Sequence, residues 1–547
     1  MSPGNVADYV IEQLQAWGVA RIYGIPGDAI LPLVDAINRH PGIRFISVKH
    51  ESAAALMAAA EAKLTGGIGV CVATSGPGAA NLINGLADAY CDRAPVLAIT
   101  GQVDSYNLGT DYKQYIDQHL LMAAVTGFSG LVTVPDSVND VLVKALRQAW
   151  SEGTVAHVAF TKDVWQMGTE EAVRSQEPFL RTLPGASPEV VGEAVKRLNE
   201  AERPAILAGR GARGLGSNLI ELAEKWRAGI CLTMPAKGVV PGDHPLVMGG
   251  LGEGGSEAST IMLLEADLVL IVGATWWPDK YVPNQARIIQ LDAVPGNIGR
   301  RMPVEFGVAG DLTRLLGEIT SGISVREKAS WLNRLETLRE GWLRRIDSEI
   351  SPDGVPLKPG LAIKSLERVC DEDAIIAVDV GDHTVWFNRI FSGKRQQILV
   401  SGSWRTMGFG LPTAIAANLA QPERQVIALV GDGCFGMSCG EFLTVVRYQL
   451  PITVVVMNNG YLAMEKGKME LKNLEPAPTT VTNPDFVKYA EACGGAGYRA
   501  ERPEELEQVL NLAFNSGRPA LVDVPVSAEA FPGLEDKKDA EESLALV

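Results

Sequence analysis

Two parts of the chain repeat one order of apolar and polar segments. In the first, residues 68–74 form an apolar run that is followed by a glycine turn, a helical pattern and a second apolar run at 96–100. In the second, residues 425–430 are followed by a glycine turn, a helical pattern at 437–448 and an apolar run at 452–457. Short continuous apolar runs that alternate with helices are typical of parallel strands buried on both faces. The repeat therefore predicts two α/β domains of similar topology.

A third domain is expected between them. A polar, acidic stretch at 167–183 and a Pro- and Gly-rich stretch at 351–360 have the composition of linkers. Between these stretches, apolar runs at 204–208, 268–272 and 287–291 again alternate with helical patterns. The predicted fold class is α/β, with three doubly wound parallel-sheet domains at about 1–168, 187–345 and 358–547.

Composition narrows the function classes. A chain of 547 residues with 46% hydrophobic residues is expected to be globular and to contain several domains. Its net charge of −16 argues against nucleic acid or an anionic membrane surface as a partner. The seven cysteines include no CxxC pair and are odd in number, which favours a reducing cytoplasm over a disulfide scaffold. No secretory signal pattern and no apolar run of membrane-spanning length is found, so we expect a cytoplasmic protein.

The strongest chemical signal is Gly431-Asp432-Gly433, followed after a predicted helix and strand by Asn459. Both polar residues are expected at the carboxyl ends of neighbouring parallel strands, where α/β sheets bind ligands. Carboxylate and amide oxygens suit Mg2+, and a glycine turn lets a phosphate approach the backbone. Taken alone, the turn is also compatible with an ordinary strand–turn–helix connection in which Asp432 caps the helix. The spacing to Asn459 favours a metal-bridged diphosphate site.

A second signal is Glu51, at the start of an Ala-rich helix predicted at 52–64. A glutamate at a helix start is often only a surface residue that interacts with the helix dipole. Here it belongs to His50-Glu51-Ser52-Ala53-Ala54. Together with the Gly-Asp-Gly and Asn motif, this element resembles the signature of thiamine diphosphate enzymes. In that family the glutamate hydrogen-bonds the cofactor aminopyrimidine and starts the proton relay that activates the cofactor.

Other motifs occur in the order of the same family, so the resemblance covers nearly the whole chain. It implies a third Mg2+ ligand in the backbone carbonyl of Tyr461, beside Asp432 and Asn459. It implies a bulky residue, Met407, that holds the cofactor in a bent shape. It implies thiamine diphosphate contacts from Ile25, Pro26, Glu51, Gly381, Asp382, His383, Met407, Gly431, Gly433 and Cys434.

Within the family, the chain is most similar to the pyruvate oxidase and acetohydroxyacid synthase branch, and several motifs favour pyruvate oxidase. These motifs are the segment 378–386, Pro235-Ala236-Lys237-Gly238 and Ala463-Met464-Glu465. In that branch the middle domain holds FAD. The resemblance then implies flavin contacts from Gly209, Gly211, Thr275, Trp276 and Asp292.

The chain differs from its relatives' motifs at two places that concern the substrate. Flavin-containing relatives carry Phe-Gln-Glu after the first domain's Gly-Gln turn, whereas this chain has Lys113-Gln114-Tyr115. Gln114 is retained, and the resemblance implies catalytic roles for it and for Glu465. Lys113 could attract a substrate carboxylate, although a lysine between tyrosine and glutamine is more often a surface residue. Many acetohydroxyacid synthases also have a Trp after the metal motif, and none occurs from Gly460 to Glu475.

These features predict Mg2+-dependent decarboxylation of a small 2-oxo acid, pyruvate, with flavin-linked oxidation of the two-carbon intermediate. The alternative is a carboligase of the acetolactate synthase type, and a distant alternative is a non-catalytic regulatory subunit. In the relatives, different subunits hold the two ends of the cofactor, which implies a homodimer or a homotetramer formed from two dimers. The charged segment 534–542 gives no reason to expect membrane docking.

Overall fold

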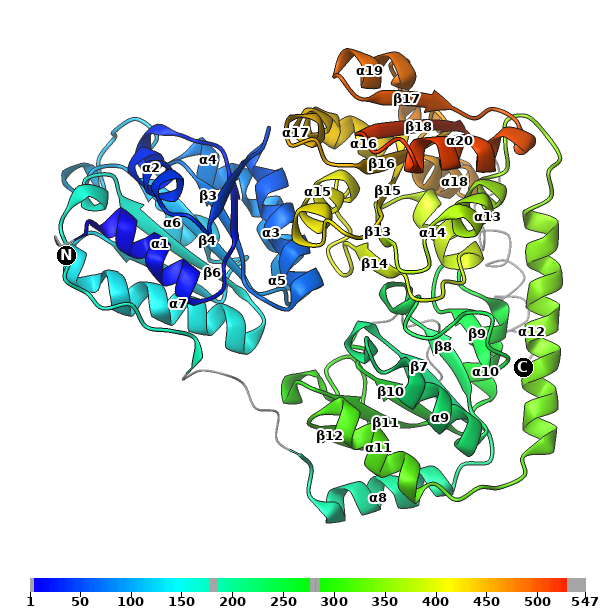
Figure 1. Cartoon of the computed structure of the whole chain (residues 1–547). Coiled ribbons are helices and arrows are strands. Elements are labelled where there is room, and N and C mark those ends of the chain that lie inside the picture. The colour runs from blue at the N-terminus through cyan, green and yellow to red at the C-terminus, as the bar shows by residue number, and fades with distance from the viewer. Residues whose placement is uncertain (1–3, 178–184, 276–280, 282–285, 529–547) are drawn as a thin grey trace.

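The computed structural model describes residues 4–177, 185–275, 281 and 286–528. They form three parallel sheets of six strands, each flanked by helices (Figure 1). The predicted α/β class with three doubly wound domains is therefore confirmed. Within the described ranges, no helix combines the length and apolar character needed to cross a bilayer.

The first sheet has the strand order β2-β1-β3-β4-β6-β5. Its strands are β1 (Arg21–Gly24), β2 (Arg44–Ser47), β3 (Gly69–Ala73), β4 (Val96–Gln102), β5 (Phe128–Val132) and β6 (Val155–Thr161). Its helices are α1 (Val6–Ala16), α2 (Leu31–Arg39), α3 (Glu51–Thr65), α4 (Pro77–Asn81), α5 (Ile83–Cys91), α6 (Gln118–Met122) and α7 (Val138–Glu152).

The third sheet, with the order β14-β13-β15-β16-β18-β17, has the same topology as the first, which confirms the internal repeat. Its strands are β13 (Ile375–Val378), β14 (Gln397–Val400), β15 (Val426–Gly431), β16 (Ile452–Asn458), β17 (Ala496–Arg499) and β18 (Ala520–Pro525). Its helices are α13 (Pro359–Val369), α14 (Asp382–Ile390), α15 (Gly410–Ala420), α16 (Asp432–Ser438), α17 (Phe442–Arg447), α18 (Ala463–Leu471), α19 (Phe486–Ala492) and α20 (Leu506–Phe514).

The middle sheet has a different order, β12-β11-β10-β7-β8-β9. Its strands are β7 (Pro204–Ala208), β8 (Gly229–Leu232), β9 (Val247–Gly250), β10 (Leu268–Val272), β11 (Arg287–Asp292) and β12 (Phe306–Ala309). Its helices are α8 (Pro188–Asn199), α9 (Gly216–Trp226), α10 (Glu257–Glu265) and α11 (Leu312–Gly322), and α12 (Ala329–Glu349) leads to the third domain. Counted along the chain, this is the order 3-2-1-4-5-6 of dinucleotide-binding sheets, with the reversal between β7 and β10.

Two expectations about local structure were wrong. The single helix predicted at 437–448 is divided into α16 and α17, which are separated by a 3-10 turn at Cys439–Glu441. Glu441 in that turn accepts hydrogen bonds from the backbone N–H groups of Lys49 and His50 in the first domain, so a tertiary contact overrides the local helical pattern. The linker predicted at 351–360 is shorter, because α13 already begins at Pro359.

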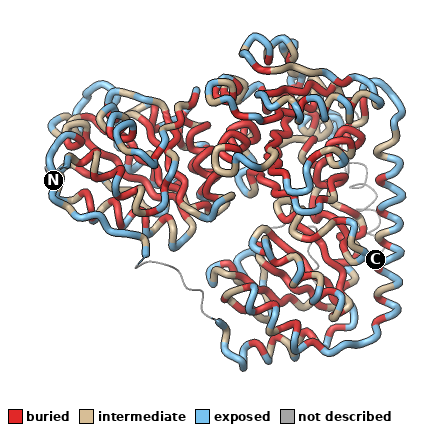
Figure 2. Tube along the Cα trace, in the orientation of Figure 1, coloured by how far each residue is buried: buried red, intermediate tan, exposed pale blue. Residues whose placement is uncertain are grey.

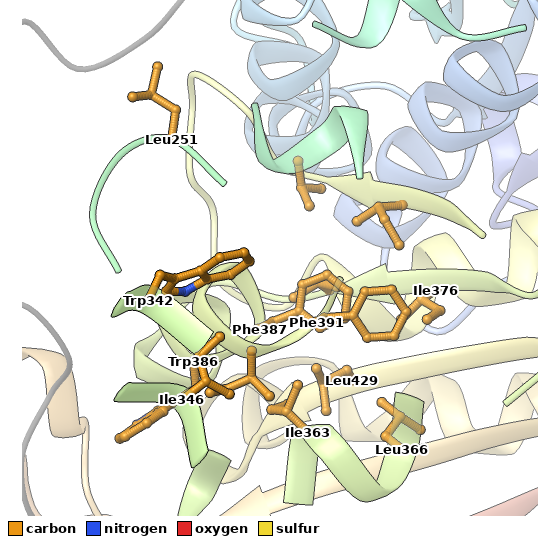
Figure 3. Close-up of a cluster of buried hydrophobic side chains, with 14 of the residues drawn as sticks. Leu251, Trp342, Ile346, Ile363, Leu366, Ile376, Trp386, Phe387, Phe391 and Leu429 are labelled. Atoms are coloured by element: carbon orange, nitrogen blue, oxygen red, sulfur yellow. The ribbon is translucent and has the colours of Figure 1, made fainter. Parts of the chain in front are cut away.

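The first and third domains share one apolar core, built around α3 and α15. Helix α3 is apolar on nearly all sides and buried along most of its length (Figure 2), as expected for a helix inside a core. Small residues allow close approach; a Cβ atom on Gly85 of α5 would lie 2.5 Å from Cβ of Ala55. A second core joins the middle and third domains through large side chains that include Trp342, Trp386 and Phe387 (Figure 3). The third domain is thus packed against both others.

Candidate active site

Three neighbouring strands of the third sheet, β13, β15 and β16, end at one edge and carry the predicted metal and diphosphate residues. They are parallel and in register, with Val378 beside Leu429 and Gly431 beside Met457. The segments after these strands therefore meet above the sheet edge. This is the carboxyl edge at which ligands bind in such sheets.

At this edge the structure brings Asp432, Asn459 and Tyr461 together. Oδ2 of Asp432 accepts hydrogen bonds from Nδ2 of Asn483 (2.6 Å) and from N–H of Gly460 (2.9 Å). Oδ1 of Asn459 accepts from N–H of Tyr461 at 3.0 Å. Burial raises the pKa of Asp432, and the hydrogen bonds from Asn483 and Gly460 oppose that shift. Hydrogen bonds thus join the start of α16, which carries Asp432, to the loop after β16, which carries Asn459 and Tyr461, and to Asn483.

The donor set fits Mg2+. A carboxylate, an amide oxygen and a backbone carbonyl are hard oxygen ligands. In the described part of the chain, no three His, Cys, Asp or Glu side chains come together as a metal-binding group. A cation at Asp432 and Asn459 would therefore need further oxygen ligands from a bound diphosphate and water, which is how Mg2+ is commonly held.

The loop after β13 places Asp382 and His383 beside this site. Nδ2 of Asn459 donates to Oδ2 of Asp382 at 3.2 Å. Burial, together with the charge of Asp432, raises the pKa of Asp382 to about 6. Burial lowers the pKa of His383 to about 4, so its ring is neutral at pH 7. Nε2 of His383 is buried without a hydrogen-bond partner among the described residues, as expected of a group that contacts a ligand.

The glycines of the Gly-Asp-Gly turn are required by their neighbours. A Cβ atom on Gly431 would lie 2.9 Å from Nδ1 of His383. A Cβ atom on Gly433 would lie 2.7 Å from Leu462 and 3.7 Å from Cε of Met407. Met407 therefore lies next to the metal motif, as its predicted role requires.

Two more predicted residues, Gly381 and Cys434, are close to this turn. Cys434 is buried, and its Sγ donates to the carbonyl of Val380 at 2.9 Å. N–H of Gly381 donates to Oγ1 of Thr384 at 3.0 Å, which fixes the start of α14. Cys434 thereby links α16 to the loop that carries the other predicted diphosphate contacts.

Two residues of the site received no role of their own from the sequence, although Asp379 belongs to the motif 378–386. Asn483 hydrogen-bonds Asp432 from 51 residues away, and no motif marks it. Asp379 is buried, and its carboxylate accepts from N–H of Val380 and N–H of Gly410, each at 2.8 Å. Burial raises the pKa of Asp379 to about 6. Asp379 could have been noticed as a charged residue directly after a buried strand.

In the first domain, the matching sheet edge carries the predicted pyrimidine contacts. Glu51 is the first residue of α3 and only 8% exposed. Its Oε2 accepts from Nδ2 of Asn81 at 3.0 Å, a partner that the sequence did not indicate. A Cβ atom on Gly78 would lie 3.4 Å from Oε1 of Glu51, so the glycine turn closes one side of the carboxylate. Ile25 and Pro26 directly follow β1, which lies between β2 and β3.

Gln114 and Glu465, the other predicted catalytic residues, lie in different domains. Gln114 is exposed and adopts a left-handed conformation with φ of 63°. It lies against the first-domain glycine turn, because a Cβ atom on Gly76 would lie 2.8 Å from its carbonyl oxygen. Glu465 on α18 is 57% exposed and paired with Lys468 at 2.8 Å. In the described residues, no hydrogen bond or ion pair joins Gln114 to Glu465, and Lys113 is exposed.

A large cavity of about 1060 Å3 is lined by all three domains. Four of the residues predicted to contact flavin, Gly209, Gly211, Thr275 and Asp292, line it. Trp276 lies outside the described residues. The cavity meets the middle sheet where its strand order reverses, because Gly209 follows β7 and Gly273 follows β10.

The residues predicted to contact flavin differ in whether contacts within the chain already explain them. Oδ1 of Asp292 accepts from N–H of Val294 (2.9 Å) and from Nδ2 of Asn297 (2.8 Å). Burial raises the pKa of Asp292. A Cβ atom on Gly209 would lie 2.3 Å from the carbonyl oxygen of Gly273, so close packing of two turns already requires glycine there. The fit to FAD therefore depends on the cavity and Asp292 more than on the glycine motif.

Comparison with known proteins identifies the family. Residues 4–121 match the N-terminal TPP binding domain of thiamine pyrophosphate enzymes, 191–319 match the central domain, and 379–524 match the C-terminal TPP binding domain. Thiamine pyrophosphate is another name for thiamine diphosphate. The chain belongs to the thiamine diphosphate enzyme family.

Relatives align along nearly the whole chain but carry different activity names. The Bacillus subtilis protein YdaP is 39% identical, over 97% of this chain and 94% of its own length. Pyruvate oxidase of Lactiplantibacillus plantarum is 32% identical, over 95% and 88%. Acetolactate synthase isozyme 1 large subunit of Escherichia coli is 31% identical, over 96% and 94%. The particular closeness to pyruvate oxidase that the motifs favour stays a prediction, as do the individual site residues and domain boundaries.

The geometry predicts different results for two substitutions in the metal loop. Asp432→Ala should abolish retention of thiamine diphosphate in Mg2+ buffer, because it removes the only predicted carboxylate ligand. Asn483→Ala should weaken binding by about ten- to a hundred-fold, the loss expected from a hydrogen bond to a charged group of about 1.5–3 kcal/mol. Tryptophan fluorescence titration with thiamine diphosphate measures both affinities. The control is Asp35→Ala, whose side chain is 71% exposed in the first domain. Wild-type affinity in Asp432→Ala would show that the metal assignment is wrong.

Proposed function

We propose that this protein binds thiamine diphosphate and Mg2+, decarboxylates pyruvate or a similar small 2-oxo acid, and oxidises the two-carbon product through FAD. The observation that carries the proposal is the presence of two sites in one chain. One is the oxygen-rich edge of the third sheet at Asp432 and Asn459. The other is the three-domain cavity at the strand-order reversal of the middle sheet.

The described positions favour particular roles for the metal-binding and diphosphate-binding residues. Asp432 and Asn459 hold Mg2+ through side-chain oxygens, and Tyr461 through its carbonyl. Gly381, Asp382, His383, Gly431, Gly433 and Cys434 surround the diphosphate. When bound, thiamine diphosphate supplies a carbon nucleophile for the 2-oxo group and takes up the electron pair left by the departing CO2. The remaining work falls to side chains that orient the reactants and move protons.

Glu51 moves the proton that starts catalysis. Its carboxyl group is buried and held by Asn81, so it presents one oxygen to a ring nitrogen in a fixed direction. Met407, beside Gly433, forms the support that holds the cofactor bent. Ile25 and Pro26 pack against the pyrimidine. Gln114 and Glu465 approach the substrate from different domains.

The carboligase of the acetolactate synthase type is the second candidate, and the names of several relatives support it. The absence of Trp between Gly460 and Glu475 favours the oxidase. The non-catalytic subunit is disfavoured by the presence of Glu51, Asp432 and Asn459 together. The protein is expected to work in the cytoplasm on a small soluble substrate, without nucleic acid or membrane as a partner.

The absorption spectrum of the purified protein, followed by product analysis, tests the proposal. Flavin bands in the near-ultraviolet and blue are expected. Pyruvate should then yield CO2 and an acetyl-level product only when a quinone or dye accepts electrons. Formation of acetolactate without an acceptor would establish the carboligase instead, and absence of CO2 under all conditions would reject both.

Glu51→Gln tests the role of Glu51. Loss of general acid–base help typically lowers rates by about a hundred- to ten-thousand-fold. The variant should still bind thiamine diphosphate and Mg2+, because neither the metal ligands nor Met407 is changed. Its turnover of pyruvate and its exchange of the cofactor C2 proton, followed by NMR in D2O, should both collapse. Exchange at the wild-type rate would assign activation to another group.

We further propose that the active unit is a homodimer or a dimer of dimers, with each cofactor held between two subunits. Glu51 and Asp432 lie in different domains, and within the described residues no hydrogen bond joins Glu51 to the metal loop of its own chain. Light scattering of active enzyme should give twice or four times the chain mass of 58.4 kDa. A catalytically active monomer would contradict this arrangement.

A further inference from the structure

Helix α5 of the first domain carries three polar residues four positions apart, and the first and third of them hold a segment of the third domain. Asn84, Asp88 and Asp92 lie on one face of the helix and its cap. Oδ2 and Oδ1 of Asp92 accept from N–H of Gly402 and of Ser403, each at 2.9 Å. Nδ2 of Asn84 donates to Oγ1 of Thr406 at 2.9 Å, and its Oδ1 accepts from the indole of Trp404 at 2.9 Å. The segment 402–406 is thus held at several points.

A buried lysine supports this attachment. Nζ of Lys63, at the end of α3, lies 2.6 Å from Oδ2 of Asp88 and 2.7 Å from Oδ2 of Asp92. The Lys63 side chain is only 2% exposed. Burial alone would lower the pKa of Lys63, but Asp88 and Asp92 outweigh it and the pKa is raised. The charged lysine therefore helps to orient the Asp92 carboxylate toward the N–H groups of Gly402 and Ser403.

The segment held by Asp92 leads directly to Met407. Oγ of Ser401 accepts from N–H of Thr406 at 2.9 Å, which closes the segment into a compact loop. Met407 follows at once and lies beside Gly433 of the metal motif. A change in the position of Gly402 and Ser403 would therefore be transmitted over four residues to Met407.

The turn at Asp92 and Arg93, at the end of α5, also contacts the middle domain. Nη2 of Arg210 donates to the backbone carbonyl of Asp92 at 2.9 Å. The guanidinium of Arg93 donates to Oδ1 of Asn297, and Asn297 in turn donates to Asp292. These residues, together with Gly402 and Ser403, all line the three-domain cavity. Asp92 thus links the cavity wall to the segment that ends at Met407.

We propose that Asp92 is a positioning residue that couples the filling of the three-domain cavity to the placement of Met407. A ligand that fills the cavity orders the wall formed by Arg93, Arg210 and Asn297, and with it the turn that carries Asp92. The Asp92 carboxylate then holds the N–H groups of Gly402 and Ser403, and so the position of the segment that leads to Met407. Coupling of this kind is reciprocal, so thiamine diphosphate and the cavity ligand should strengthen each other's binding. The inference rests on the proposed function, because it takes FAD as the cavity ligand.

Hydrogen–deuterium exchange on the full-length protein tests the coupling directly. The N–H groups of Gly402, Ser403 and Thr406 report the state of the segment. FAD alone, added to protein freed of cofactors, should slow exchange in peptides covering 400–407 as well as at the cavity wall around 209–211. In Asp92→Ala the wall should still be protected, but 400–407 should exchange fast with and without FAD. Asp92→Asn, which keeps one acceptor oxygen, should restore part of the protection, and Asp35→Ala should behave as the wild type.

A titration provides a second readout that a general loss of stability would not produce. In the wild type, FAD should tighten thiamine diphosphate binding by at least about five-fold, the lower end of typical coupling between sites. The ratio of the thiamine diphosphate affinities measured with and without FAD should fall to about one in Asp92→Ala. It should also fall in Gly402→Ala, where the new Cβ atom would lie 2.6 Å from Oδ1 of Asp92 and displace it from the opposite domain. A purely structural defect would weaken binding equally with and without FAD and leave the ratio unchanged.

The outcomes separate this proposal from the proposed function. If FAD protects the cavity wall but not 400–407, or if Asp92→Ala keeps the wild-type ratio, the coupling is wrong while the flavin function stands. If FAD does not protect the wall at all, the flavin function fails and the coupling falls with it. Three results together would establish Asp92 as the positioning residue. Asp92→Ala loses the protection of 400–407, the affinity ratio falls to about one in Asp92→Ala and Gly402→Ala, and Asp92→Asn restores part of the protection.

Discussion

The packing of α3 against α15 is the interaction on which the rest of the molecule depends. Two Ala-rich helices from opposite ends of the chain share one core, and α3 is buried along most of its length. Such a helix cannot present a polar face, so its polar residues gather at its ends. Glu51 lies at the first residue of α3, and Lys63 lies in its last turn. One buried helix therefore connects the predicted proton-transfer group with the ionic cluster that holds the segment before Met407.

The carboxylates at the third sheet edge show that this region is built for more than stability. Asp379 and Asp382 follow β13 and Asp432 follows β15, and burial raises the pKa of each. An acidic group whose pKa is raised by folding favours the folded state at low pH, and that contribution is lost as pH rises through the folded pKa. In protein without bound cations, ionisation of these carboxyl groups therefore lowers the free energy of unfolding near neutral pH. A bound Mg2+ would offset it, which is the pattern expected where charge is kept for a ligand.

The sequence predicted the fold and the edge of the third sheet because both depend on local patterns. Apolar runs identify the parallel strands, and parallel strands place the residues after them at one edge, so Asp432 and Asn459 could be expected to meet. Asn483 and Asn81 could not, because each reaches its partner through a tertiary contact that no spacing encodes. The helix predicted at 437–448 was wrong for a similar reason, since Glu441 breaks it to bond a turn of the first domain. Gly209 and Gly211 were expected for a flavin, but packing of neighbouring turns also requires them.

The arrangement also explains how one fold can serve relatives with different activity names. Under the proposed function, the oxygen-rich edge of the third sheet and Glu51 serve the decarboxylation step. The same proposal assigns the fate of the two-carbon product to the cavity, whose walls come from all three domains. Most of β14 and of the segment 401–405 lines the cavity, and this segment leads on to Met407. A change in cavity contents would therefore bear on the cofactor site. Oxidation and carbon–carbon bond formation can therefore diverge through the cavity walls while the decarboxylating site stays the same.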